Sequence, residues 1–183
     1  MLDEQEFLSP YGVRALSRAH AEHPYSVAVG DERFSVAYEP GESRSGIFGG
    51  NSNWRGPIWM PVNYLLVESL RRFGRYYGDT FQVECPTGSG RKMNLDQVAD
   101  ELVRRLAALF MPGPEGRRPC FGDDLLQQDD PHFREHLLFH EYFHGDTGRG
   151  LGAAHQTGWT ALIGLLLGPR AGGAGAAPVP GGD

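Results

Sequence analysis

Apolar residues recur at helical spacing between Pro57 and Gly78. The positions that share one face lie three or four residues apart: Val62, Leu66, Leu70, Phe73 and Tyr77. This spacing predicts an amphipathic helix that buries this face. Proline is tolerated in the first turn of a helix, so Pro57 and Pro61 mark where the helix begins.

A second helix is predicted from Leu95 to Leu109. Asn94 precedes it and Gln97 follows three residues later, which is a variant of the capping box. Its apolar positions again share one face: Leu95, Val98, Leu102, Leu106 and Leu109. The proline- and glycine-containing run Met111–Pro114 ends the pattern, so this helix should also pack one face against a core.

The rest of the chain is less regular. A third segment, roughly Thr157 to Leu167, is apolar on nearly all sides and predicts a buried helix. Residues 169–183 are almost wholly glycine, alanine and proline, and we expect them to be disordered because they cannot bury enough surface to offset their ordering entropy. Phe133 to His144 fits either a helix or a strand. Residues 25–53 combine short extended pieces with glycine-rich loops that can place side chains around a ligand.

Length and charge narrow the class of protein. The chain has 183 residues, enough for one domain, and 17 Lys and Arg against 23 Asp and Glu give a net charge of −6. This acidic balance disfavours nucleic acid and anionic membranes as partners. No run approaches the ~20 apolar residues of a membrane span, and the acidic start does not resemble a signal peptide, so we expect a cytoplasmic protein. Two cysteines, Cys85 and Cys120, are too few for a disulfide scaffold and lack the paired spacing of a zinc site.

The run from His140 to His144 reads H-E-Y-F-H. It satisfies the H-E-x-x-H pattern of zinc metalloproteases, in which two histidines one helical turn apart hold the metal and the glutamate is the base. That site needs a sustained helix and a third protein ligand, for which His155 and Asp146 are the available candidates. A Gly-Asp-Thr-Gly turn follows at once and no glutamate comes after Glu141. We therefore favour a site without a metal or other cofactor.

A second candidate surface lies between Asn51 and Trp59, in the run N-S-N-W-R-G-P-I-W. Two indoles, a guanidinium and several amides within so short a span can cover the apolar face of a sugar and hydrogen-bond its hydroxyls. Alternatively, Trp59 packs the helix against the core and Arg55 pairs with an acid. We favour the structural role for Trp59 and leave both roles open for Trp54 and Arg55. Tyr64, early in the helix, is a further candidate for substrate binding.

Glu141 also has a second interpretation, as a carboxylate among aromatic residues that activates a water molecule as general base. A single glutamate is more often solvated or salt-bridged. By itself, therefore, Glu141 does not indicate a catalytic site.

Three motifs occur in a fixed order: the N-W-R-G-P-I-W box, the E-x-Y-x-x-x-x-G run that begins at Glu141, and the G-W-T-A-L segment around Trp159. In that order they resemble the C-terminal part of glycoside hydrolase family 63, which contains glucosidases and mannosylglycerate hydrolases. The matching blocks span about Leu2 to Gly168. The resemblance implies an all-α fold for residues 1–168, the last few helical hairpins of an (α/α)6 toroid with long loops and short β pieces.

The same resemblance implies roles for individual residues. Glu141 falls on the general base of an inverting, exo-acting, glucosidase-like hydrolysis of O-glycosyl bonds. Trp54 and Arg55 fall on the box that lines the pocket, and Trp159 on the final inner helix. The substrate would be a carbohydrate.

The resemblance also implies that the active site is incomplete. An inverting glycosidase needs an acid and a base with carboxyl groups ~6.5–9.5 Å apart. The family's acid, an aspartate, would lie upstream of Met1, so the chain alone is expected to be inactive and to expose apolar side chains such as Ile163 and Leu166. A separately encoded N-terminal half is a candidate partner, and a non-catalytic carbohydrate-binding remnant is the alternative function.

Overall fold

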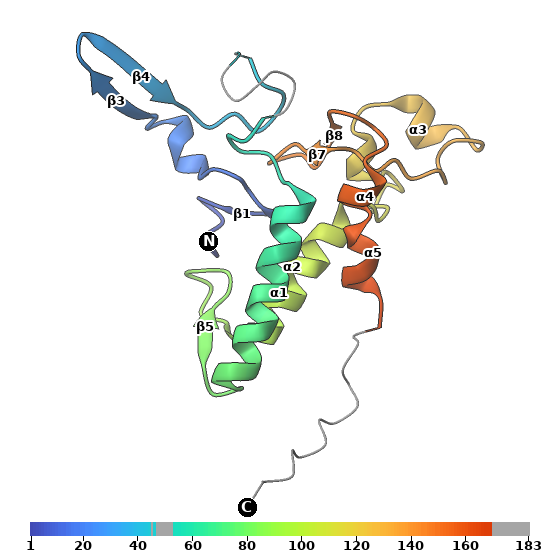
Figure 1. Cartoon of the computed structure of the whole chain (residues 1–183). Coiled ribbons are helices and arrows are strands. Elements are labelled where there is room, and N and C mark those ends of the chain that lie inside the picture. The colour runs from blue at the N-terminus through green and yellow to red at the C-terminus, as the bar shows by residue number, and fades with distance from the viewer. Residues whose placement is uncertain (45, 47–52, 170–183) are drawn as a thin grey trace, which may run out of the picture.

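Two long helices form the centre of the protein. The computed structural model describes residues 1–44, 46 and 53–169, and in it α1 (Met60–Tyr77) packs along α2 (Leu95–Ala108), as Figure 1 shows. Both helices lie where their apolar spacing predicted them. The tail predicted from residue 169 falls, from residue 170 onward, outside the described residues.

Helix α2 follows its sequence pattern closely. The Asn94 side chain accepts a hydrogen bond from the backbone N–H of Gln97 at 2.8 Å, and the Gln97 side chain accepts one from the backbone N–H of Asn94 at 2.9 Å. These reciprocal bonds form the expected capping box. All five apolar positions of the predicted face are buried in the structure: Leu95, Val98, Leu102, Leu106 and Leu109.

Helix α1 buries a face that overlaps only partly with the predicted one, since Leu66 and Leu70 of the predicted stripe are half-buried against the main core. Its buried residues are Met60, Asn63, Val67 and Gly74, whereas three residues of the predicted stripe are exposed, namely Val62, Phe73 and Tyr77. Asn63 is buried because its side-chain amide donates to the carbonyl of Val13 at 3.0 Å and its oxygen accepts from the Val13 N–H at 2.8 Å. A polar residue thus occupies the core-facing side of the helix, which apolar spacing alone could not reveal.

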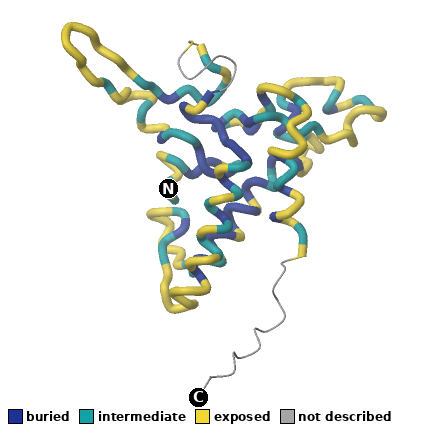
Figure 2. Tube along the Cα trace, in the orientation of Figure 1, coloured by how far each residue is buried: buried dark blue, intermediate teal, exposed yellow. Residues whose placement is uncertain are grey.

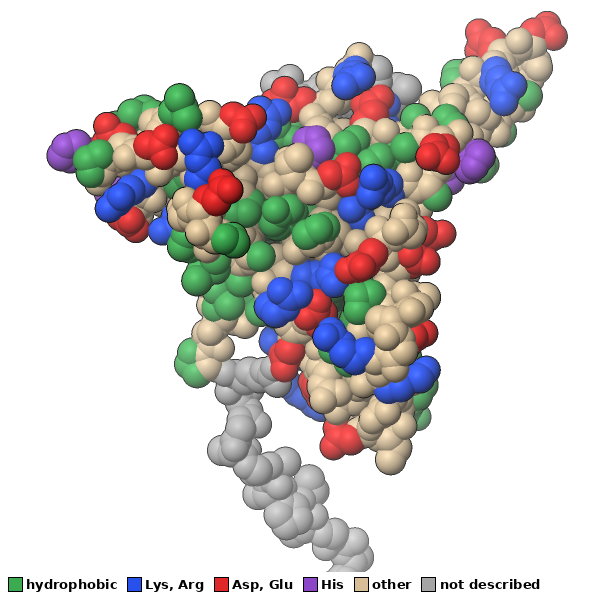
Figure 3. All heavy atoms as spheres, turned by 180° about the vertical axis from the view of Figure 1, so that it is seen from behind, with side chains coloured by type: hydrophobic (Ala, Val, Ile, Leu, Met, Phe, Trp, Pro, Cys, Tyr) green, Lys and Arg blue, Asp and Glu red, His purple; other side chains and the backbone are tan. Residues whose placement is uncertain are grey.

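The apolar segment at the C-terminal end is a broken helix. It forms α4 (Thr157–Thr160) and α5 (Leu162–Leu167), separated at Ala161. Ile163 and Leu166 are buried in the main core with α1 and α2, so the expectation that they would be exposed was wrong. Leu165 and Leu167 are 67% and 59% exposed, so the segment is not buried on all sides. Figure 3 shows hydrophobic side chains gathered on the back of the molecule, above the start of the grey trace.

The structure overturns the all-α prediction. The part of the chain that the structure describes is 33% helical and 17% strand, a mixed α/β arrangement rather than helical hairpins of a partial (α/α)6 toroid. Each sheet of the described residues is a two-stranded antiparallel hairpin. The pairs are β1 (Leu8–Ser9) with β2 (Gly12–Val13), β3 (Tyr25–Val29) with β4 (Glu32–Val36), β5 (Gln82–Glu84) with β6 (Lys92–Asn94), and β7 (Tyr142–Phe143) with β8 (Gly150–Leu151).

A glycine turn accounts for the β3–β4 hairpin. Gly30 adopts a φ of 62° between β3 and β4, a conformation that favours glycine and closes the hairpin. This hairpin projects from the body in Figure 1 and is exposed over most of its length in Figure 2. Residues 133–141 are turns and extended chain that lead into β7. The helix alternative for Phe133 to His144 was therefore not the one adopted.

The remaining elements are short. They are η1 (Arg18–Ala21), η2 (Pro119–Phe121) and α3 (Leu125–Asp129). A small second core of Trp59, Tyr142 and Leu151 joins the start of α1 to the β7–β8 hairpin. Cys85 and Cys120 are both buried and free. Among the described residues, no helix is both long enough and apolar enough to cross a membrane.

Candidate functional site

The β7–β8 hairpin and the start of α1 form one unit. Ile58 donates its N–H to the carbonyl of Phe143 at 2.8 Å and accepts from the Phe143 N–H at 3.0 Å. This pairing brings Trp59, the residue before α1, against Tyr142, with ring centroids 4.8 Å apart. Two segments more than 80 residues apart in the sequence are thereby fixed together.

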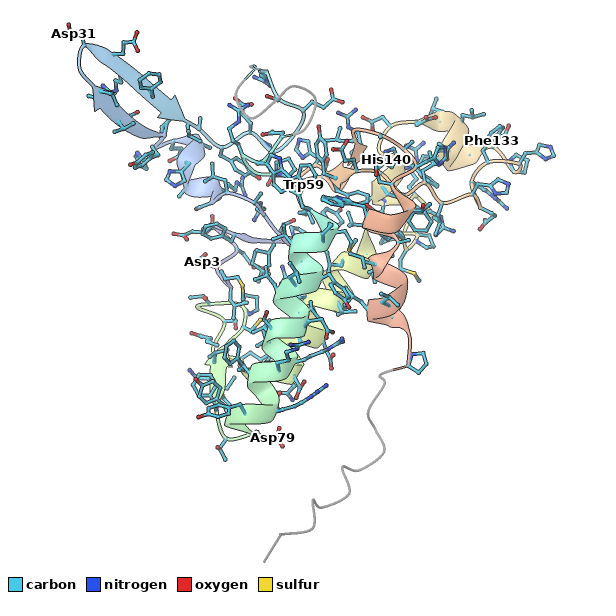
Figure 4. The ribbon with its side chains drawn as sticks, viewed as in Figure 1. Asp3, Asp31, Trp59, Asp79, Phe133 and His140 are labelled. Atoms are coloured by element: carbon cyan, nitrogen blue, oxygen red, sulfur yellow. The ribbon has the colours of Figure 1, made fainter. Side chains whose placement is uncertain are left out.

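Four aromatic rings gather at this junction. The Trp54 ring stacks on Trp59 with centroids 3.8 Å apart and planes within 2°, and Trp159 meets Trp59 edge-on at 6.2 Å. Trp59 is only 2% exposed, whereas Trp54 and Trp159 are 40% and 36% exposed. We call Trp54, Trp59, Tyr142 and Trp159 the aromatic cluster. Its buried centre, Trp59, lies at the start of α1 in Figure 4 and has the structural role favoured for it. Its two outer indoles are partly exposed to solvent.

Glu141 immediately precedes β7 and is next in sequence to Tyr142 of the aromatic cluster. Its backbone N–H donates to the carbonyl of Ala153 at 2.8 Å, and its carboxylate accepts from the Ala153 N–H at 3.4 Å. Gly152, with a φ of 69°, comes so close that a Cβ there would lie 2.7 Å from Oε2 of Glu141. The backbone at residues 152–153 therefore cradles this carboxylate, and the cradle requires glycine at position 152.

Besides burial, the carboxylate of Glu42 raises the pKa of Tyr142, as does that of Glu141. The pKa of Tyr142 is raised to about 12, first by burial of its ring and then by the negative charges of Glu42 and Glu141. Sequence reasoning missed Glu42. No spacing in the sequence links Glu42 to Tyr142, because only the fold brings its charge near that ring.

Arg55 and Tyr64, the two other residues expected to bind substrate, are not members of the aromatic cluster. The Arg55 guanidinium is buried and donates to Glu39 at 2.6 Å and to Ser43 at 2.8 Å. This is the ion pair that the structural alternative anticipated. Tyr64 is half-buried on α1 and packs against the main core. A role for either residue in substrate binding stays a prediction.

The H-E-x-x-H run is extended chain and strand, not helix. Nδ1 of His144 accepts from the backbone N–H of Asp146 at 3.2 Å, and the His140 ring lies over Gly150. Burial lowers the pKa of both histidines. The two histidines therefore lack the helical geometry that a zinc protease site needs. In the part of the chain that the structure describes, no three His, Cys, Asp or Glu residues are grouped as metal ligands.

Asp146 instead joins two buried groups. Its carboxylate accepts from Arg14 at 3.0 Å and from the Tyr38 hydroxyl at 2.9 Å. Burial, followed by the charge of Asp146, raises the pKa of Tyr38. A cavity of about 450 Å³ opens beside this ion pair and is lined partly by Tyr38, Glu42 and His144. Glu42 and the residue that follows β7, His144, therefore line the same cavity.

Comparisons with known proteins identify relatives of this arrangement. A family model described as a mannosylglycerate hydrolase MGH1-like glycoside hydrolase domain matches residues 1–160. The chain is 56% identical over 165 residues to an uncharacterized protein of Saccharomyces cerevisiae, YMR196W, covering 89% of this chain and 15% of that protein.

Two further relatives are glucosidases by name. The chain is 26% identical to the mannosyl-oligosaccharide glucosidase of Saccharomyces cerevisiae, over 92% of this chain and 14% of the relative. It is also 26% identical to a probable mannosyl-oligosaccharide glucosidase of Schizosaccharomyces pombe, over 88% of this chain and 13% of the relative. The chain thus spans only 13–15% of the length of these curated relatives. The matches confirm the resemblance seen in the motifs: the chain belongs to the MGH1-like glycoside hydrolase domain family.

Proposed function

We propose that this chain supplies part of the active site of an inverting, glucosidase-like hydrolase of O-glycosyl bonds, with Glu141 as the general base. The observation that carries the proposal is the cradled Glu141 carboxylate, on the hairpin whose Tyr142 packs into the aromatic cluster. Membership of a glycoside hydrolase family and two relatives named glucosidases support a carbohydrate substrate.

In this proposal Glu141 removes a proton from water as the water oxygen attacks the anomeric carbon. The leaving oxygen takes a proton from a separate acid at the same time, so both groups are needed in one transition state. The exposed faces of Trp54 and Trp159 suit the apolar face of a sugar ring. They would hold the substrate while the carboxylate acts.

The acid comes from outside the 183 residues in this proposal, and the isolated chain does not turn over glycosides. General acid–base groups each contribute typically 10²–10⁴-fold, so loss of one suppresses the reaction. The rest of the substrate pocket would be missing as well, which removes positioning of the sugar. Glu42 is the nearby carboxylate that must be excluded as the acid.

The test is to co-express the chain with a separate polypeptide that completes the hydrolase domain, and to measure release of glucose and of mannosyl products. We expect activity only in the complex. Glu141→Gln should abolish turnover and keep sugar binding, because the amide keeps the shape but cannot take the proton. Glu42→Gln is the matched control and should retain turnover. Hydrolysis by the isolated chain, lost in either variant, would refute the assignment of the acid.

A non-catalytic carbohydrate-binding role is the second candidate. It is favoured by the two exposed indoles at the edge of the aromatic cluster. A complex that binds sugar through Trp54 and Trp159 but shows the same turnover with Glu141→Gln as without it would support this role instead.

A further inference from the structure

A second pocket lies away from the Glu141 carboxylate. It has a volume of about 250 Å³ and is bounded by η2, α3, the extended chain before β7, and β8. His140 lines it, whereas its neighbour Glu141 does not. Side chains of consecutive residues in an extended segment point to opposite sides, so His140 faces this pocket while Glu141 faces Gly152. In Figure 4, His140 lies between Trp59 and the loop that carries Phe133.

Two polar atoms of the pocket's lining residues are buried and lack a hydrogen-bond partner among the described residues. They are Oε1 of Gln127, from α3, and Nδ1 of His140. A buried polar atom without a partner is costly, and native proteins rarely leave one. Here two of them, from separate segments, belong to residues that line one cavity. We call it the Gln127–His140 pocket.

The neighbouring glutamine shows what an ordinary structural role looks like. Gln128 donates to the carbonyls of Arg118 at 3.0 Å and Gly122 at 2.8 Å, and it accepts from the Arg118 N–H at 3.0 Å. It thereby fixes the loop before α3. Oε1 of Gln127, by contrast, has no hydrogen-bond partner among the described residues, and Gln127 lines the pocket.

The other lining groups define the chemistry of a ligand. Arg149 offers hydrogen-bond donors, and its stem is held in place because it lies over Gly122, where a Cβ would come within 2.5 Å of it. Asp123 offers acceptors, and Leu138 adds an apolar wall. Asp124 also lines the pocket, but its Oδ1 already accepts from the backbone N–H groups of Leu126 and Gln127 at the start of α3, which leaves its Oδ2 as the acceptor. The two carboxylates outnumber the one guanidinium, which disfavours an anionic ligand. Hydroxyl groups suit this mixture because each one donates and accepts.

Two other interpretations fit less well. Cys120 also lines the pocket, but burial raises the pKa of its thiol to about 12, so it stays a thiol rather than a nucleophilic thiolate. An extended oligosaccharide is too large, because the pocket is smaller than the ~300–1,000 Å³ of sites for drug-sized ligands. The volume suits a ligand of a single ring.

We propose that the Gln127–His140 pocket is a binding site for one neutral, hydroxyl-rich ring such as a single hexose, separate from Glu141 and the aromatic cluster. Gln127 accepts a hydrogen bond from one hydroxyl and His140 pairs with another. Arg149 and the two aspartates hold the rim. The site binds without catalysing, so it goes beyond the proposed hydrolase function.

The test is a titration of the full chain with D-glucose, followed through the ring resonances of labelled histidine by NMR. Binding should shift the His140 signals. Gln127→Leu should weaken glucose binding by about threefold to tenfold, the effect of one lost hydrogen bond. The signals that are missing from the spectrum of His140→Phe identify those of His140. Inorganic phosphate should leave the His140 signals in place, because two carboxylates line the pocket.

Two control variants separate this site from the proposed active site. Trp54→Ala and Glu141→Gln should leave the shift of the His140 signals unchanged, whatever they do to turnover in a completed enzyme. The proposal is overturned if glucose does not shift the His140 signals of the unmodified chain, if phosphate shifts them more strongly than glucose, or if the effect of glucose is lost in Trp54→Ala but kept in Gln127→Leu. The comparison of glucose with phosphate on the unmodified chain needs no variant, so it tests glucose binding near His140 even if a variant fails to fold.

Discussion

The indole of Trp54 lies flat on the indole of Trp59, with ring centroids 3.8 Å apart. Trp54 is 40% exposed as a residue and Trp59 is 2% exposed. The inner ring also donates its Nε1–H to the carbonyl of Asn53 at 2.9 Å and stacks on Tyr142. A single stack therefore has a structural member and a member that is open to a ligand.

This difference predicts unequal effects of two alanine substitutions. Trp59→Ala should lower the free energy of unfolding by about 3–5 kcal/mol, since it empties the second core and removes the residue that precedes α1. Trp54→Ala should cost only about 0.5–1.5 kcal/mol, the value of one aromatic pair. Urea denaturation of both variants measures the difference. Equal losses would mean that Trp54 is also a core residue.

Removing Asp146 should lower the free energy of unfolding by more than the partial exposure of its side chain suggests. Arg14 has a side chain that is 2% exposed, and Asp146→Ala would leave its charge without that partner. We expect a loss of about 2–3 kcal/mol, reduced from the fully buried case because the Asp146 side chain is 33% exposed. Tyr38→Phe is the control, since it removes one hydrogen bond to the same carboxylate and should cost about 0.5–1.5 kcal/mol. Thermal or urea unfolding that ranks the two variants in the opposite order would contradict this assignment.

Glu101 predicts a loss of stability in acid. The hydrogen bond from Arg104 lowers the pKa of Glu101 to about 2, against the opposing effect of burial and with help from Arg105. A folded pKa below the ordinary value of 4.5 stabilises the protein above that pH, and this contribution is lost as the pH falls from about 4.5 to about 2.

Glu101→Gln should therefore be less stable than the unmodified chain at pH 7, by roughly 1–3 kcal/mol, and the gap should close below pH ~4.5. Urea unfolding at a series of pH values measures the gap. The difference between the two proteins isolates Glu101 from His140 and His144, whose lowered pKa values affect both equally. A gap that is constant from pH 7 to pH 2 would show that the carboxylate charge contributes nothing.

A helix and its buried face could be predicted from the sequence where the capping residues and the apolar spacing indicate the same helix. The capping residues Asn94 and Gln97 and the apolar stripe of α2 point to the same helix, and the structure has it. In α1 the extent of the helix was predictable but its buried face was not. Asn63 is buried by bonds to Val13, fifty residues away in the sequence. Helical periodicity counts only apolar residues, so it assigns such a position to the surface.

The fold class failed for a related reason. The family resemblance supplied an all-helical architecture, whereas turns such as the one at Gly30 close two-stranded hairpins in this chain. The packing role of Trp59 could be predicted from its place just before the helix. The arrangement of the candidate site could not be predicted, because its groups come together only through the fold. Glu42, whose charge acts on Tyr142, and Arg14, which pairs with Asp146, are examples.

The closeness of Gly152 to Glu141 gives a final prediction about the candidate base. Gly152→Ala adds a Cβ that would lie 2.7 Å from Oε2 of Glu141 and 2.9 Å from Cε1 of Tyr142, at a φ of 69° that disfavours alanine. Both contacts must give way, so the carboxylate should move out of its cradle. We expect a loss of about 2–4 kcal/mol in the free energy of unfolding, which combines backbone strain with overpacking. In a completed hydrolase the same change should lower turnover more than it raises KM, because it displaces the base and leaves the exposed indoles in place.

Gly30→Ala is the matched control for this change. Gly30 has a similar φ of 62°, but a Cβ there would meet nothing within 4 Å. It therefore isolates the cost of the backbone conformation, about 1 kcal/mol. The excess loss in Gly152→Ala over Gly30→Ala, measured by urea unfolding, reports the collision with Glu141 and Tyr142. If the two variants lose the same stability and Gly152→Ala keeps full turnover in the completed enzyme, residue 152 does not position Glu141, and the cradle has no part in placing the base.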